Sequence, residues 1–437
     1  MKRIFTASLL ILIFASGIDA ASAAAKLGGP CTKVGEKVLI AKSQLICTKT
    51  GKKLLWAKSP AAIGKTPVAA PVSVTTPVSS LAKDSRLTTS ATLPISACKL
   101  KDATDGDPNS NARFGASQGF PRPAEAIYGQ AKVRLLVLPV SLKGQPFEAE
   151  DLKRLNESFS IVKEQYEKNF YGKLNLEFIV PDQKLWLNID KIPEESGLLS
   201  LGVGVNAIDN VREVLKLTSK DLNLPSYDGL IIETRQFNKL GIATAFPGAV
   251  FDTPSGTVHR VSALTGKDGS TGYVAVHELG HALFGFEDLY LFGNNSVNAG
   301  SWDLMSNLSQ YFFAWNRYLS GYLSDSWVTC HNPATTSESF YFLSQVDELS
   351  NSPHMVSIPV TSNISINAEV RIVDGYIENG LGLLLYKVDS NKPHGQVPIT
   401  SEKKLVKKGE SRDYEGWTFK VLDSDNSGLL FSMVPKA

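Results

Sequence analysis

The sequence predicts an α+β fold in two parts: a half that mixes helices and strands, followed by a half made of strands. In the first half, short apolar runs alternate with segments whose apolar residues recur every three or four positions, as in amphipathic helices. After Cys330 the apolar residues recur at every second position instead, as in strands with one buried face. The change of period predicts an antiparallel, sandwich-like domain at the C-terminal end.

The first 25 residues have the pattern of a secretory signal peptide. Met1–Arg3 is basic, Ile4–Phe14 is apolar, and Ala21–Ala23 offers a small-residue cleavage site. The apolar run is too short for a membrane span, and no longer one follows. We therefore expect a secreted protein with no membrane span.

Residues 26–57 and 58–95 differ in composition from the rest. The first stretch is a small basic module with two cysteines; its lysines are Lys33, Lys37, Lys42, Lys49, Lys52 and Lys53. Its charge suits contact with an anionic wall polymer or cell surface, although a solvated face is the simpler explanation. The second stretch is rich in Pro, Ala, Ser and Thr and predicts a linker. The net charge of +2 gives no reason to expect a nucleic-acid partner.

Residues 96–330 and 331–437 form the two predicted domains. The first is expected to contain strands at 133–140, 174–180, 230–233 and 243–246, with helices at 151–169 and 206–217. The second is expected to contain six strands, at 339–346, 355–360, 368–373, 382–388, 416–422 and 428–434.

Four cysteines in an exported chain predict two disulfides. Cys31 and Cys47 bracket a compact stretch with strand-like segments, so we pair them. Cys98 and Cys330 then form the second bond, which ties the start of the first large domain to its end.

The most informative stretch is His277-Glu278-Leu279-Gly280-His281, within an apolar helix-like segment. Histidines at positions i and i+4 of a helix lie one turn apart on the same face and can hold one zinc ion. The glutamate after the first histidine is then placed to act as a general base on water. His277 and His281 are therefore predicted metal ligands, and Glu278 is the predicted catalytic residue.

The segments around this motif extend the prediction. Gly285 stands where the helix should stop, and two acids follow it, Glu287 and Asp288, either of which is suited to be a third ligand. Met305 follows about twenty residues later in a Gly-Ser-Trp-Asp-Leu-Met-Ser segment, at the place where metzincins carry a methionine on a tight turn. Tyr311, close behind, is a candidate to hold an oxyanion.

Between residues 130 and 390 the chain resembles the immune inhibitor A type of secreted bacterial metallopeptidase, a metzincin-like zincin. The segments similar to that family, besides the zinc helix, are Lys132–Pro139, Tyr166–Phe178, Tyr227–Ile232, Phe313–Leu323, Glu369–Arg371 and Gly382–Asp389. One position departs from the pattern: Phe284 stands where the family has its glycine, and Gly285 follows one residue later.

This resemblance implies a zincin catalytic domain and favours Asp288 as the third ligand. In the family the acid stands three residues after the helix-ending glycine, and Gly285 to Asp288 keeps that interval. Counting ten residues from His277 selects Glu287 instead. The expected protein is a secreted zinc endopeptidase that acts on a protein or peptide substrate. The alternatives are a non-enzymatic surface-binding protein on a degenerate peptidase fold and a zinc hydrolase of cell-wall peptides.

Two further segments resemble calcium-binding loops. Residues 105–111, Asp-Gly-Asp-Pro-Asn-Ser-Asn, alternate oxygen ligands and are suited to a structural Ca²⁺, although a polar loop is the simpler prediction. Asp423–Gly428 begins in the same way but has Val434 where the bidentate glutamate should stand, so we expect a turn there.

Overall fold

The computed structural model describes residues 37–40, 43–50, 53–58, 79–88, 90–102, 115–142, 146–189, 207–234, 243–265, 271–290, 299–307, 310–374 and 379–436. The predicted signal peptide, Cys31 and the possible calcium loop at 105–111 lie outside these residues. The chain divides into two compact units, Met1–Val74 and Thr75–Ala437.

The first unit contains one antiparallel sheet in the order β1-β2-β3. Its strands are β1 (Lys37–Ile40), β2 (Ser43–Thr50) and β3 (Lys53–Lys58). Cys47 lies opposite Trp56, and both side chains are buried. Cys47 is disulfide-bonded, while its expected partner, Cys31, lies outside the described residues. The strand-like segments predicted around Cys47 are confirmed.

The second unit begins with a six-stranded sheet in the order β5-β4-β7-β11-β8, in which β6 also pairs with β4. Its strands are β4 (Lys132–Leu142), β5 (Asn175–Ile179), β6 (Leu187–Ile189), β7 (Gly229–Thr234), β8 (Thr244–Phe246) and β11 (Val261–Thr265). All pairs are parallel except β8 with β11. A short hairpin, β9 (Phe251–Thr253) and β10 (Gly256–Val258), follows β8.

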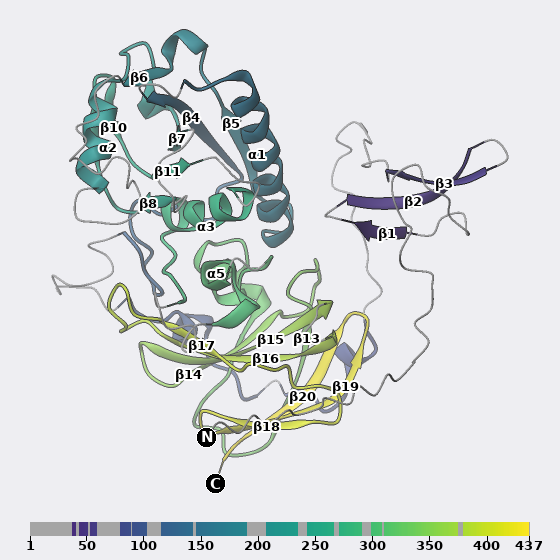
Figure 1. Ribbon diagram of the computed structural model, residues 1–437. Coiled ribbons are helices and arrows are strands. Elements are labelled where there is room, and N and C mark those ends of the chain that lie inside the picture. Colours follow the sequence, from purple (N-terminus) through teal and green to yellow (C-terminus); the bar gives the residue numbers. More distant parts are fainter. Residues whose placement is uncertain are drawn as a thin grey trace, which may run out of the picture. The chain divides into compact units, whose positions relative to one another are not determined.

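Helices cover both faces of this sheet (Figure 1). They are α1 (Ala149–Asn169), α2 (Ala207–Lys216) and α3 (Thr271–Phe284), followed by the shorter α4 (Leu304–Asn307) and α5 (Ala314–Leu319). Single 3-10 turns are η1 (Leu81–Lys83), η2 (Ile95–Cys98), η4 (Gln183–Leu185), η6 (Leu224–Ser226), η8 (Gly300–Trp302) and η9 (Asp325–Trp327).

Alternation along β4 explains the layers. Val133, Leu135 and Val137 join the core that contains α1 and α3, whereas Leu136 and Leu138 join the core that contains α2. Successive side chains of a strand point to opposite faces, so a strand buried on both sides reads as one apolar run. The sheet is therefore the central layer between two helical layers.

Helix α1 forms as its periodicity predicts and supports α3. Glu148 and Asp151 make a capping box at its first turn. Its buried face includes Leu155, Phe159 and Tyr166. The Tyr166 hydroxyl donates a hydrogen bond of 2.8 Å to the Val276 carbonyl of α3. This contact anchors the middle of the helix that carries the histidine motif.

The C-terminal half contains two sheets that face each other (Figure 1). One has the order β12-β14-β15-β16-β17 and the other β13-β20-β19-β18. The strands are β12 (Val328–Cys330), β13 (Ser339–Ser344), β14 (Met355–Pro359), β15 (Ile364–Asp374), β16 (Asn379–Asp389), β17 (Ile399–Ser401), β18 (Ser411–Tyr414), β19 (Trp417–Asp425) and β20 (Gly428–Pro435). Apolar side chains from both sheets form one core. The protein is thus α+β, with the predicted sandwich after Cys330.

The two halves of this unit share a core. Trp315 of α5 and Tyr386 of β16 belong to the same apolar cluster. The backbone N–H of Trp315 donates to the Tyr386 hydroxyl at 3.2 Å. Glu369 of β15 is fully buried and accepts the Ala314 N–H at 2.7 Å, while Arg371 donates to the Phe312 carbonyl. Residue 330 therefore marks a change of secondary structure, and the contacts continue across it.

The predicted linker ends earlier than its composition suggested. Ser79 donates to the Asp425 carboxylate at 2.5 Å, and the Leu93 N–H donates to the Cys330 carbonyl at 2.8 Å. Residues 79–88 and 90–95, which were expected to belong to a linker, therefore pack against the C-terminal sheets. Hydrogen bonds to the strands satisfy backbone polar groups of this segment, and amino-acid composition does not reveal such long-range partners.

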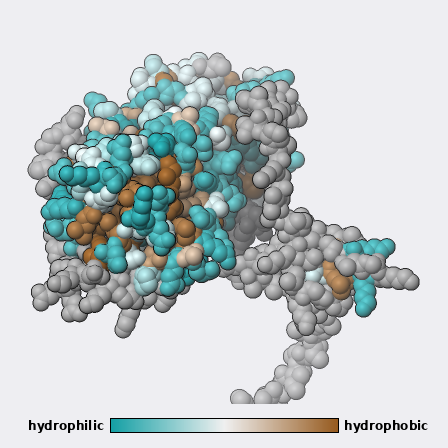
Figure 2. Space-filling view, turned by 90° about the horizontal axis from the view of Figure 1, so that it is seen from above, coloured by the Kyte–Doolittle hydropathy of each residue, from teal (hydrophilic) through white to brown (hydrophobic). Residues whose placement is uncertain are grey.

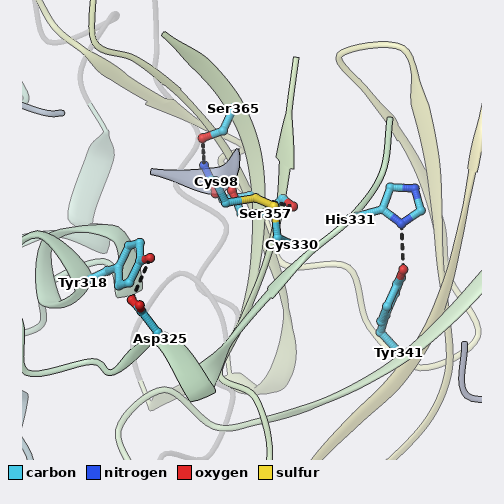
Figure 3. The surroundings of a disulfide bond; sticks show 9 residues. Cys98, Tyr318, Asp325, Cys330, His331, Tyr341, Ser357 and Ser365 are labelled. Atoms are coloured by element: carbon cyan, nitrogen blue, oxygen red, sulfur yellow. Dashed lines mark hydrogen bonds between the residues drawn. A yellow bond between two sulfur atoms is a disulfide. The ribbon is translucent and has the colours of Figure 1, made fainter. Parts of the chain in front are cut away.

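Cys98 and Cys330 form a disulfide with a Cα–Cα distance of 5.7 Å (Figure 3). It joins η2 to β12 across 232 positions of the sequence. The predicted second disulfide is confirmed. Asp425 also behaves as expected: its carboxylate accepts the N–H groups of Ser427 and Gly428, which forms the turn between β19 and β20.

None of the described helices is long and apolar enough to span a membrane. Figure 2 shows one face on which hydrophilic residues predominate and apolar residues gather in one area. The large apolar side chains exposed among the described residues include Leu217, Leu349 and Val360. Some exposure of apolar side chains is ordinary on protein surfaces.

We expect two buried histidines to make the fold sensitive to acid. His331 donates to or accepts from the Tyr341 hydroxyl (Figure 3), and His354 bonds to the Gln345 carbonyl. Burial lowers the pKa of each imidazole to about 4. Each is neutral when folded and binds a proton near pH 6.5 when unfolded, so stability falls as the pH drops from 6.5 towards 4.

The expected loss is about 2 kcal/mol for each histidine between pH 7 and pH 5. Urea unfolding of the wild type, His331→Gln and His354→Gln at both pH values measures it. Each substitution should remove about that much of the pH-dependent loss. If both variants lose as much stability as the wild type between pH 7 and pH 5, the histidines are not responsible.

Candidate metal centre

Helix α3 and the segment after it bring three potential ligand atoms together. His277 Nε2 and His281 Nε2 are 3.1 Å apart, and Asp288 Oδ1 lies 3.1 Å from the first and 3.2 Å from the second. Within the described part of the chain, these three residues form the one cluster with metal-ligand geometry. They are the three residues that the sequence predicted as metal ligands.

Second contacts fix which nitrogen of each imidazole faces this cluster. His277 Nδ1 lies 3.0 Å from the Leu304 carbonyl, and His281 Nδ1 lies 2.6 Å from the Phe286 carbonyl. A carbonyl only accepts, so each Nδ1 must carry the proton. In the neutral rings, both Nε2 atoms then have lone pairs that point at the same place, as metal-binding histidines require.

The arrangement fits a tetrahedral zinc ion. Zinc with ligands at about 2.0–2.1 Å holds neighbouring ligand atoms about 3.3 Å apart. The observed edges of 3.1 to 3.2 Å are close to that value. In addition, Asp288 Oδ1 is buried and makes no hydrogen bond of ordinary geometry with the described residues. Two ring nitrogens and a carboxylate oxygen that converge in this way are suited to hold a cation between them.

Glu278 lies beside the cluster in a buried position. Burial raises the pKa of its carboxyl, while His277 and His281 partly oppose the shift. The backbone of Ala245, in strand β8, hydrogen-bonds to this carboxyl. A glutamate whose pKa is raised by burial is suited to accept and return a proton.

The acid pair after the helix separates into two roles. Burial raises the pKa of Asp288, but the imidazoles of His281 and His277 outweigh it and hold that pKa well below its usual value. Glu287 is 2% exposed and faces away from the cluster, towards His394. Consecutive side chains after a tight turn diverge, so the two acids have different partners.

Gly285 decides where the chain turns. It has φ +61°, and its N–H bonds to the His281 carbonyl at 2.9 Å. Arg122 closes the end of α3 by donating to the Phe284 carbonyl at 2.6 Å and the Gly285 carbonyl at 3.2 Å. A cation at a helix C-terminus also complements the helix dipole. Nothing in the local sequence marked Arg122, which lies more than 160 positions away.

Met305 lies directly beneath the histidine motif. It is fully buried, and a Cβ added to Gly280 would lie 2.6 Å from its sulfur. Buried Asp303 organises this segment by accepting the N–H groups of Met305 and Phe313. Burial raises the pKa of Asp303 to about 7, against the lowering effect of these bonds. The predicted methionine position thus supports the helix at its one glycine between the two histidines.

A cleft of about 690 Å³ opens over these residues. His277, Glu278, His281 and Asp288 line one side, and residues 243–250, which include β8, line another. Tyr290 and His394 also line it, although the sequence singled out neither of them. Tyr290 follows Asp288 closely in the sequence. His394 is more than a hundred positions away and reaches the cleft only in the folded chain.

Tyr311 does not line this cleft. Its hydroxyl accepts from Lys168 at 3.3 Å, and its ring lies under the Lys168 and Arg371 cations. The prediction that it holds an oxyanion is therefore wrong. Tyr290 is the tyrosine next to the ligands, with its ring centre 6.0 Å from that of His277.

Gly285→Ala is expected to destabilise the protein and weaken metal binding. The left-handed backbone costs a Cβ-bearing residue about 1–2 kcal/mol. The new Cβ would also lie 2.5 Å from the Gly115 carbonyl oxygen. Gly172→Ala is the matched control, because Gly172 has φ +67° and nothing within 4 Å of its added Cβ.

Thermal unfolding of both variants separates strain from collision. The Gly172 variant should lose only the stability that backbone strain costs. The Gly285 variant should lose clearly more stability and should bind zinc more weakly. Equal losses, with equal zinc affinity, would show that the contact between Gly285 and Gly115 is unimportant.

Comparisons with known proteins identify no family. No protein-family model matches the chain, and no curated protein matches it. The resemblance to immune inhibitor A-type peptidases stays a prediction from the segments quoted above.

Proposed function

We propose that this protein is a secreted zinc-dependent endopeptidase. The observation that carries the proposal is the convergence of two imidazole Nε2 atoms and one carboxylate oxygen within 3.2 Å of one another, next to a buried glutamate. Three protein ligands with one further position open to the cleft are typical of catalytic zinc sites, whereas structural sites have four protein ligands.

A zinc ion held by His277, His281 and Asp288 would supply the Lewis acidity that polarises a peptide carbonyl and makes water acidic. Glu278 takes the proton from the attacking water, for which its raised pKa suits it. It then returns that proton to the leaving amine nitrogen. The Ala245 backbone and the burial of Glu278 hold the carboxyl in place between these two transfers.

The strand beside the cleft offers a way to align an extended peptide. β8 stands at the end of the strand order and borders the cleft with Thr244, Ala245 and Phe246. A peptide that adds to a sheet edge gains main-chain hydrogen bonds and places alternate side chains in pockets. Pairing with an edge strand does not require a terminus of the substrate, so this arrangement supports cleavage in the interior of a peptide chain.

Two other functions compete with this proposal. A surface-binding protein on a degenerate peptidase fold would use the basic module of residues 26–57 and the C-terminal sheets. A zinc hydrolase of cell-wall peptides would use the same chemistry on a different substrate. The complete set of His277, Glu278, His281 and Asp288 favours an enzyme over the binding protein.

One experiment tests all three. The exported form, without residues 1–25, is purified, its zinc content is measured, and casein and peptidoglycan are offered with and without a chelator. We expect about one zinc per chain and chelator-sensitive cleavage of casein. Cleavage of peptidoglycan alone selects the cell-wall enzyme, and no zinc with no cleavage selects the binding protein.

A further inference from the structure

His394 brings the C-terminal half of the protein to the candidate metal centre. It lies in the loop between β16 and β17, and it lines the same cleft as His277, Glu278 and Asp288. More than a hundred positions separate it from the ligand-bearing turn. The C-terminal half therefore contributes a side chain to the lining of the cleft.

Glu287 holds this histidine in place. His394 Nδ1 lies 2.9 Å and 3.2 Å from the two carboxylate oxygens of Glu287. Since Glu287 is almost fully buried, its carboxylate needs a hydrogen-bonded partner of this kind. Neighbouring residues thus serve two purposes: Asp288 faces the metal cluster, and Glu287 positions His394.

The pairing favours a cationic ring. The hydrogen bond with Glu287 raises the pKa of the His394 imidazole, although burial acts against it. A doubly protonated ring donates from both nitrogens. The His394 side chain keeps 44% of its surface exposed, so a bound molecule in the cleft has room to contact it.

We propose that His394 is a substrate-binding residue of this cleft. Glu287 orients its ring, and His394 donates a hydrogen bond to the carbonyl oxygen of the peptide bond that is cut. This inference deepens the proposed function and rests on it. Donors aimed at that oxygen act most strongly when negative charge develops on it, so they lower the barrier more than they strengthen substrate binding. No atom is transferred by His394 itself.

The test compares His394→Gln with the wild type in three measurements: zinc content, kcat and KM for a peptide substrate, and affinity for a phosphinic peptide. The phosphinate oxygens of that ligand stand in for the tetrahedral oxyanion. We expect unchanged zinc, a fall in kcat of about 10²-fold with little change in KM, and a similar loss of phosphinic-peptide affinity. Glu287→Gln should show a smaller loss of the same kind.

His259→Gln is the matched control. His259 forms a similar pair with Glu125, at 3.2 Å, and lies outside the lining of the cleft. It should leave all three measurements unchanged. The inference is overturned if His394→Gln keeps kcat and phosphinic-peptide affinity within about twofold of the wild type, or if its losses only follow a loss of zinc.

The outcomes separate this inference from the proposed function. If the wild type cleaves peptides and His394→Gln does so equally well, only the role of His394 fails. If the wild type cleaves no peptide, the proposed function fails. Phosphinic-peptide binding, measured by calorimetry, then still decides whether His394 contacts a ligand in the cleft, because it needs no turnover.

Discussion

Glu278→Gln is expected to keep its zinc and lose at least about 10²-fold in kcat, the usual contribution of a general base. Glutamine has nearly the same shape as glutamate but cannot take a proton from water. Glu278 is not part of the ligand cluster, which consists of His277, His281 and Asp288. Metal content and catalysis should therefore separate in this variant.

Zinc per chain and the rate of peptide cleavage are measured side by side for Glu278→Gln and the wild type. Glu213→Gln is a suitable control, because Glu213 is an exposed residue of α2 paired only with Lys216 among the contacts described. It should match the wild type in both measurements. Near-normal turnover by Glu278→Gln would refute the proposed mechanism.

Asp288→Ala is expected to lose most of its zinc, with an affinity at least about 100-fold weaker. Even residues that only support a ligand cost about 10- to 100-fold when they are changed, and Asp288 supplies a ligand atom directly. The loss also leaves the two imidazole Nε2 atoms, 3.1 Å apart, without the carboxylate oxygen that lies 3.1 and 3.2 Å from them.

Glu287→Ala is the matched control for this second prediction. Glu287 is the neighbouring acid, but its carboxylate bonds to His394 and lies outside the cluster. This variant should keep its zinc while it loses the support for His394. Competition with a chromogenic chelator measures both affinities. The opposite ranking, with zinc lost from the Glu287 variant, would make Glu287 the third ligand and leave the proposed reaction class intact.

Some of this protein can be predicted from the sequence because the responsible interactions are local. The spacing of His277 and His281 places both imidazoles on one helix face wherever that helix lies. Gly285 ends the helix because a left-handed residue is needed there. Strand alternation after Cys330 and the apolar run of β4 likewise follow from the period of the strand, whatever the strands pack against.

Other features exist only in the folded chain, because they depend on contacts between distant segments. In the sequence, the interval from Gly285 selects Asp288 and the count from His277 selects Glu287. Only the folded chain shows Asp288 beside the two histidines and Glu287 paired with His394. Arg122 reaches the end of α3 from a segment far earlier in the chain.

The two wrong expectations have the same origin. Tyr311 is near Met305 in sequence, but packing turns its ring towards Lys168 and away from the cleft. Residues 79–88 and 90–95 belong to a stretch with the composition of a linker, yet hydrogen bonds join them to the C-terminal sheets. Local sequence determines the shape of each element, whereas the partner of a side chain is decided by which distant surface buries it and satisfies its polar groups.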